Sequence, residues 1–174
     1  MLFMGEEYGE TTPFHYFVDH QDPKLIEAIR AGRKQEFASG MAEKDPPDPK
    51  APETFQASKL AWDKRNEGAH AELFDWYRQL LSLRKSHPAL QARDRNNVHI
   101  RVLDERAITI SWKSESGHRL LAVLNIGPND TMYKPLPHHY GMRIVLSSDV
   151  TEPAPDLSDR LFKILPQSVI VYTN

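Results

Sequence analysis

The hydrophobic residues follow two different spacings in the two halves of the chain. After about residue 92 they recur at every second position, which is typical of half-buried β-strands. Turn-forming residues separate these runs, as in Gly127–Asp130, and the stretch 120–126 is almost continuously apolar. The second half is therefore expected to be a small antiparallel β-sandwich of about five to seven short strands. The clearest expected strands cover 98–102, 107–112, 120–126, 143–146 and 168–172.

Before residue 92 the apolar residues lie three and four positions apart, which predicts helices. The clearest helix covers 67–86 and ends before Pro88. A second helix is expected to open at Asp22 and Pro23, because aspartate caps a helix and proline suits its first position. We expect Gly32 to end or interrupt this second helix, because glycine is a weak helix former.

The first four residues, Met-Leu-Phe-Met, are all apolar and are followed by Gly5. This pattern predicts a very short, buried parallel strand. Four residues cannot form a sheet alone, so such a strand needs neighbouring strands. The fold class expected from both halves is α+β, with residues 1–92 helical and residues 93–174 all-β.

Composition narrows the functional classes. The chain has 174 residues, of which 40% are hydrophobic and 26% charged, and its formal net charge is −2. This balance argues against a nucleic acid or an anionic membrane as the partner. There is no cysteine, which excludes disulfides and fits a reducing cytoplasm. No apolar run approaches the ~20 residues of a membrane span, and no nucleotide, phosphate-loop or zinc motif occurs, so no cofactor or metal is expected.

Two acidic residues, Glu6 and Glu7, lie where the expected first strand meets its loop. Active sites of α/β barrels are built on that face, and paired carboxylates can hydrolyse glycosides. Adjacent residues in an extended segment point to opposite sides, however, so the two need not converge on one bond. A catalytic role, a substrate contact or loop brace, and a solvated loop all remain open for this pair.

An aromatic cluster follows at Phe14, Tyr16 and Phe17, next to Asp19 and His20. Sugars present flat apolar faces ringed by hydroxyl groups, so aromatic rings beside polar side chains suit a sugar site. The same rings could instead pack the loop onto the core. An Asp19–His20 catalytic dyad is disfavoured because no nucleophile is identifiable. The pair His138–His139 lacks further ligands at metal-binding spacing, and we expect both residues at the surface of a strand.

The motifs also resemble a known family. The segment Leu2–Tyr8 followed by Thr12–His20 is similar to the region around the eighth barrel strand of malto-oligosyltrehalose trehalohydrolases, which belong to the α-amylase family of glycoside hydrolases. The Thr-Pro-Phe-His-Tyr-Phe-Val-Asp-His run and Gly-Arg-Lys-Gln-Glu-Phe are the more specific motifs. Further similar segments lie at 32–37, 48–49, 54–62, 77–84, 87–90, 121–125 and 165–171.

The resemblance implies that residues 1–92 are the last strand and helices of a (β/α)8 barrel and that residues 93–174 are the C-terminal β-sandwich. The family hydrolyses the α-1,4-glucosidic bond next to the terminal trehalose of maltooligosyl-trehalose. Its catalytic carboxylates follow earlier barrel strands, and no segment here matches them. The chain alone is therefore expected to be inactive.

The resemblance further implies that the loop from Glu6 to His20 lines the rim of the active cleft. The expected substrate-binding residues are Glu6, Glu7, Phe14, Tyr16, Asp19 and His20. The expected partner is maltooligosyl-trehalose or another α-glucan oligosaccharide, together with self-association through the exposed barrel remnant. Two alternatives stay open: part of a glycogen branching or debranching enzyme, and a non-catalytic α-glucan-binding module.

Overall fold

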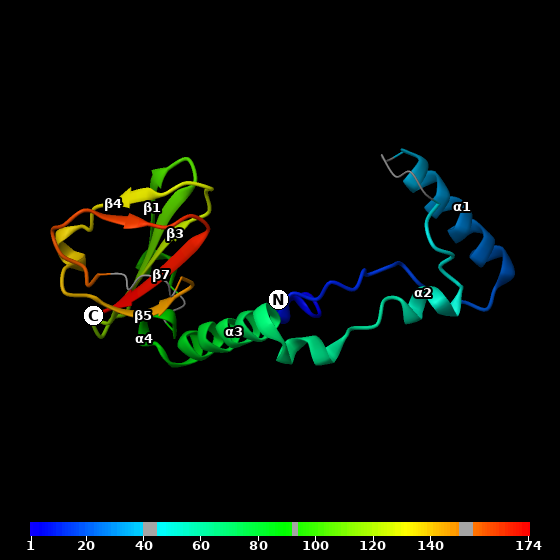
Figure 1. The fold of residues 1–174 in the computed structure, drawn as a ribbon, viewed down its shortest axis with the longest axis horizontal. Coiled ribbons are helices and arrows are strands. Elements are labelled where there is room, and N and C mark those ends of the chain that lie inside the picture. The colour runs from blue at the N-terminus through cyan, green and yellow to red at the C-terminus, as the bar shows by residue number, and fades with distance from the viewer. Residues whose placement is uncertain (40–44, 92–93, 150–154) are drawn as a thin grey trace. The chain divides into compact units, whose positions relative to one another are not determined.

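The computed structural model describes residues 1–39, 45–91, 94–149 and 155–174. It divides into two compact units, Met1–Phe74 and Asp75–Asn174. The chain contains both α-helices and β-strands: the α-helices lie before residue 92, and an antiparallel sheet follows it (Figure 1). The α+β class expected from the apolar spacing is confirmed.

The first unit consists of short helical segments joined by extended chain. Its elements are η1 (Glu6–Tyr8), α1 (Pro23–Ser39), α2 (Pro52–Gln56), η2 (Trp62–Asn66) and the first turns of α3 (Gly68–Ser86). Residues 1–4 form no strand in this structure: the segment is not paired with another strand and turns into η1 at Gly5. The strand predicted there, which was expected to need neighbouring strands, stays a prediction. A strand forms only where another strand offers backbone groups to pair with.

Helix α1 begins as predicted and ends later than predicted. The Asp22 carboxylate accepts a hydrogen bond from the backbone N–H of Lys24, at 2.9 Å, which caps the first turn. Gly32 does not interrupt the helix, which continues to Ser39. A single glycine costs a helix only about 1 kcal/mol. Ion pairs within the helix, Arg30–Glu27 and Arg33–Glu36, both at 2.6 Å, stabilise the turns on either side.

The second unit contains a five-stranded sheet in the order β1-β2-β3-β7-β5, and every pair in it is antiparallel. The predicted strands are confirmed to within two residues. Two further short strands, β4 and β6, pair with each other and were too short to stand out in the sequence. The strands are β1 (Val98–Asp104), β2 (Ala107–Lys113), β3 (Arg119–Asn125), β4 (Thr131–Tyr133), β5 (Arg143–Ser147), β6 (Phe162–Ile164) and β7 (Ser168–Thr173).

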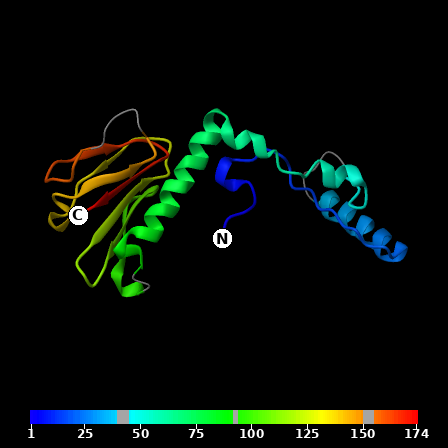
Figure 2. The same cartoon turned by 90° about the horizontal axis from the view of Figure 1, so that it is seen from below.

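Two apolar clusters cover the two faces of the five-stranded sheet. On one face, Leu121 and Tyr172 pack with residues of β4 and β6. On the other face, Leu120 and Val171 pack with Ala89 of α4 (Pro88–Gln91) and with Leu83 near the end of α3. Figure 2 shows the last turns of α3 beside the sheet. The near-continuous apolar run of β3 follows from this arrangement, because a strand with both faces covered must be apolar on both.

Candidate functional site

The aromatic loop, residues 10–20, has no regular secondary structure and is held by contacts to distant parts of the chain. The backbone N–H of Val18 donates to the carbonyl oxygen of Pro49, at 2.9 Å. The N–H of His15 donates to the hydroxyl of Ser58, at 3.1 Å. Because these partners lie outside the loop, its conformation depends on residues 45–58 as much as on its own sequence.

Glu6 and Glu7 lie in the 3-10 turn η1 and not at the end of a strand. The turn is bounded by Gly5 and Gly9, which both have positive φ. The Glu6 carboxylate accepts a hydrogen bond from the backbone N–H of Phe3, at 2.8 Å. This contact braces the turn from within, so the extended geometry assumed for the pair is wrong.

Four aromatic rings in the first unit form a row in which each ring makes an edge-to-face contact with the next. The ring centroids of Phe3 and Phe14 are 5.3 Å apart, those of Phe14 and Phe17 are 6.1 Å apart, and those of Phe17 and Phe55 are 5.1 Å apart. We call these four residues the phenylalanine row. Each ring is exposed, from 58% at Phe3 to 36% at Phe17. The ring contacts of the phenylalanine row therefore hold the aromatic loop in place, and the rings remain exposed to solvent.

Tyr16 lies apart from the phenylalanine row and faces helix α1. The guanidinium of Arg33 lies 5.3 Å from the centre of the Tyr16 ring and 5.0 Å from that of Phe37. The same guanidinium forms an ion pair with Glu36. Stacking on a guanidinium is a cation–π contact, which fixes the ring while one of its faces stays accessible.

Asp19 and His20 are exposed residues with different surroundings. The Asp19 carboxylate forms an ion pair with Lys50, at 2.6 Å, and also accepts from the Gln21 amide, at 3.3 Å. The hydrogen bond from Lys50 lowers the pKa of Asp19. Because Asp19 is engaged by Lys50, the structure gives no support to an Asp19–His20 dyad.

A carboxylate that the sequence analysis did not single out organises this region. Glu10 has a side chain only 5% exposed. Burial alone would raise its pKa, but hydrogen bonds from the backbone N–H groups of Thr12 and Ala61 and from Lys64 outweigh it and lower the pKa. The carboxylate thus joins the loop to residues 61–64. The local sequence did not reveal this role of Glu10, because two of its partners, Ala61 and Lys64, are about fifty positions away.

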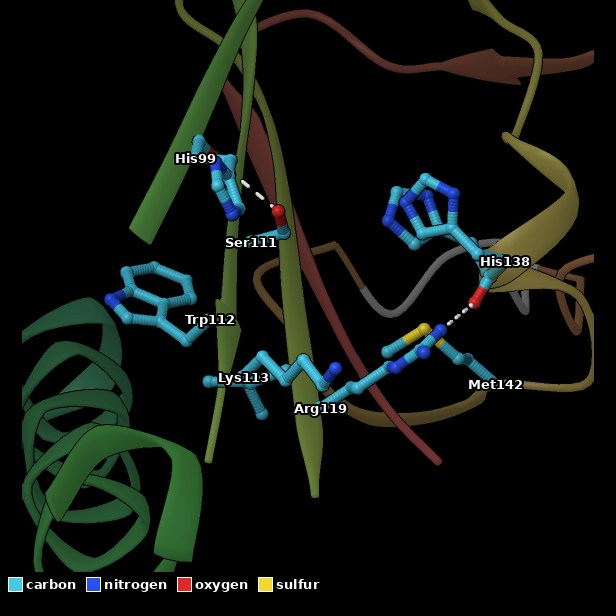
Figure 3. A pocket seen from close by; sticks show the side chains of 9 residues that line it. His99, Ser111, Trp112, Lys113, Arg119, His138 and Met142 are labelled. Carbon is cyan, nitrogen blue, oxygen red and sulfur yellow. Dashed lines mark hydrogen bonds between the residues drawn. The ribbon is translucent and has the colours of Figure 1, made fainter. Parts of the chain in front are cut away.

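The second unit carries a concave pocket of about 160 Å³ on the face of the sheet that packs with β4 and β6. Its walls come from β1, β2, β3 and η4 (Pro137–His139). Figure 3 shows His99 and His138 on opposite sides, with Arg119 reaching the backbone oxygen of His138. The expectation that both adjacent histidines are at the surface of a strand is wrong. They lie in η4, and His139 is buried with its ring 3.3 Å from the Tyr133 hydroxyl.

Two absences hold for the part of the chain that the structure describes. No cluster of three or more histidine, aspartate or glutamate side chains is arranged to hold a metal ion. No helix there is long and apolar enough to cross a bilayer.

Comparison with known proteins relates the chain to one enzyme group. The chain is 50% identical over 91 residues to a malto-oligosyltrehalose trehalohydrolase from Rhizobium sp. and 48% identical over 91 residues to one from Mycobacterium tuberculosis. Each match covers 52% of this chain. The resemblance to malto-oligosyltrehalose trehalohydrolases is confirmed. The chain spans only 15% and 16% of the length of these two relatives. No family model matches the sequence.

Solved structures extend the similarity to nearly the whole chain. A Salmonella typhimurium structure assigned as an alpha amylase is 31% identical, with a TM-score of 0.75 over 98% of this chain and 27% of its own. A trehalose-6-phosphate hydrolase from Bacillus licheniformis matches 97% of this chain and 34% of its own, with a TM-score of 0.56 at 17% identity. The second match shows a shared fold alone. The similarity to glycoside hydrolases thus extends beyond the half that the trehalohydrolases cover.

Proposed function

We propose that this chain is the C-terminal part of a glycoside hydrolase that cleaves the α-1,4-glucosidic bond next to the terminal trehalose of maltooligosyl-trehalose, releasing trehalose. The observation that carries the proposal is the identity of 42–50% to relatives named malto-oligosyltrehalose trehalohydrolase, from bacteria and from Saccharolobus solfataricus. In this proposal, residues 1–92 complete a (β/α)8 barrel, and residues 93–174 form the C-terminal β-sandwich. The absence of cysteine is consistent with the cytoplasmic location that we propose with it.

Three described carboxylates of the first unit have contacts that favour a supporting role over a catalytic one. Retaining glycosidases need two carboxyl groups about 5–5.5 Å apart on either side of the scissile bond. Glu10 is buried and saturated with donors, Glu6 braces its own turn, and Asp19 is paired with Lys50. We therefore propose that the catalytic carboxylates belong to another part of the enzyme and that this chain alone is inactive.

The aromatic loop is the part of the chain that we assign to substrate binding. Phe14 and Tyr16 are 56% and 46% exposed, and each is held by a neighbouring side chain. Rigid, exposed rings suit the apolar faces of glucose units and lose little conformational entropy on binding. Asp19 and His20 add exposed polar groups for hydroxyl recognition, and Glu6 and Glu7 complete the proposed set.

A segment exchange tests this proposal. The segment of the Rhizobium enzyme that aligns with this chain is replaced by the chain, and trehalose release from maltooligosyl-trehalose is measured. We expect the exchanged enzyme to release trehalose, and Phe14→Ala in it to raise KM more than it lowers kcat. A folded exchanged enzyme that hydrolyses other α-glucans but releases no trehalose would favour the branching or debranching alternative.

The exposed phenylalanine row favours a second candidate, a non-catalytic α-glucan-binding module. This candidate predicts that the chain alone binds maltooligosaccharides without turnover. Isothermal titration of the chain with maltoheptaose distinguishes the two, because a barrel part that lacks its partner strands is expected to bind the sugar far more weakly than the exchanged enzyme does.

A further inference from the structure

The pocket of the second unit is lined on one side by polar groups from three adjacent strands. In the register of the sheet, Ser111 lies opposite His99, and Lys113 lies opposite Arg119. Directly opposed residues, and residues two apart on one strand, share a face of the sheet. These four side chains therefore converge on the same face, where η4 adds His138.

The positive charges at this pocket have no carboxylate partner in the described part of the chain. Among the residues that the structure describes, Lys113 and Arg119 form no ion pair. The Arg119 guanidinium donates a hydrogen bond from its Nη1 to the backbone oxygen of His138, at 2.7 Å. This contact fixes the guanidinium at the pocket and leaves its other N–H groups available, because a guanidinium has five donors.

The buried His139 responds to this concentration of positive charge. Burial is the main cause that lowers its pKa to about 4, and the charges of His138, Arg119 and Arg101 lower it further. The charges of three side chains thus act on His139, and among the residues that the structure describes no acidic side chain lines the pocket. An arrangement with donors on several sides and no acceptor carboxylate disfavours cations and favours anions.

We propose that this pocket binds a small oxyanion, namely a phosphate group, either free or carried by a sugar. Lys113 supplies a point charge, Arg119 supplies planar paired donors, and His138 supplies a ring N–H group. The Ser111 hydroxyl donates to the backbone oxygen of His99, at 3.5 Å, and would have to turn to donate to the anion. A neutral sugar is a poorer fit, because the charged side chains of Lys113 and Arg119 lie at the pocket, and Trp112, which also lines it, packs against the apolar cluster of the other face. The site lies in the second unit and is independent of the substrate-binding loop proposed above.

The test is a titration of the 174-residue chain, followed by NMR spectra of the backbone amides and histidine rings at constant ionic strength. The probes are inorganic phosphate, glucose 6-phosphate and maltotriose. We expect phosphate to shift the resonances of Lys113, Arg119 and His138 saturably. Lys113→Gln should weaken binding about tenfold, the loss expected for one charge-assisted contact. His138→Ala is a second variant that changes the pocket without altering a strand.

The matched control is Lys163→Gln, since Lys163 is a half-exposed lysine of β6 whose partner is Asp130. It should bind phosphate as the unaltered chain does. Glucose 6-phosphate that binds as tightly as inorganic phosphate, or more tightly, supports the site. It also indicates that the phosphate group is carried by a sugar and is not free phosphate. The proposal is overturned if phosphate causes no saturable shift, if Lys113→Gln and Lys163→Gln behave alike, or if maltotriose shifts the same resonances more strongly than phosphate.

Discussion

The two units of the chain are stabilised by different kinds of contact. The second unit has apolar clusters on both faces of its sheet, with fully buried side chains such as Leu121 and Tyr172. In the described part of the first unit, Tyr8 is the one hydrophobic side chain that is fully buried, and the phenylalanine row is exposed. The second unit thus has an apolar core of its own. The first unit relies on hydrogen bonds, ion pairs and ring edges, and its apolar surface is available for further contacts.

The largest expected effect is in the core of the second unit. Leu121→Ala removes a side chain that is 0% exposed and leaves a cavity between β3 and its neighbours. We expect it to lower the free energy of unfolding by about 2–5 kcal/mol. The control is Val102→Ala on β1, which is 69% exposed. Urea unfolding followed by circular dichroism measures both, and equal losses would show that the sheet does not depend on this cluster.

The largest effect in the first unit is expected at a polar residue. Glu10→Gln removes the buried charge and turns an amide group toward donors, so N–H groups such as that of Ala61 lose their acceptor. We expect a loss of about 1–3 kcal/mol in local stability. Hydrogen exchange at Thr12 and Ala61 measures it. Glu72→Gln, on an exposed position of α3, is the control, and unchanged exchange in both variants would contradict the role of Glu10.

The same carboxylate predicts how acid affects the first unit. The pKa of Glu10 is lower in the folded chain than in the unfolded chain, so its ionised form stabilises the fold. This contribution is complete above the ordinary glutamate pKa of about 4.3 and is lost as the pH falls from there through the lower folded pKa. The protection factors at Thr12 and Ala61, measured relative to the unfolded chain at the same pH, should therefore fall in acid. In Glu10→Gln this fall should be absent, and its persistence there would assign it to another group.

A smaller effect is expected in the phenylalanine row. Phe17→Leu keeps an apolar side chain but removes ring-edge contacts with Phe14 and Phe55. We expect a loss of about 0.5–1.5 kcal/mol, as for other aromatic pairs. Thermal unfolding of Phe17→Leu and of Leu121→Ala, measured under the same conditions, compares the loss of stability in the two units. A loss as large as that of Leu121→Ala would mean that the row acts as a core.

The smallest effect on stability is expected at the exposed pair of Asp19 and Lys50. Asp19→Asn should leave the midpoint of thermal unfolding unchanged, because exposed ion pairs contribute little. In the segment-exchanged enzyme, the same change should raise KM about tenfold if Asp19 binds a sugar hydroxyl. An unchanged KM would remove Asp19 from the proposed substrate-binding set.

The strands of the second unit could be predicted because each half-buried strand alternates apolar and polar residues, as in 107–112. Helix α3 and the Asp22 cap could also be predicted, because the residue pattern that indicates each of them lies within a few neighbouring positions. The strand expected at residues 1–4 is not formed in this structure, because strand formation depends on a pairing partner that the local pattern does not supply.

The features that the sequence could not reveal depend on contacts between distant positions. Glu10 is identified by Ala61 and Lys64, and the burial of His139 follows from the fold of β4 and η4 around the sheet. The pocket likewise combines three strands and η4. Self-association through the exposed apolar surface of the first unit stays a prediction, which sedimentation analysis of the chain can test.

The most direct test of the proposed function is trehalose release from maltooligosyl-trehalose by the purified 174-residue chain, beside the segment-exchanged enzyme. We predict no release by the chain above the buffer blank and clear release by the exchanged enzyme. Release by the chain alone, abolished by Glu7→Gln or Asp19→Asn, would contradict the proposal and place catalytic carboxylates in the first unit.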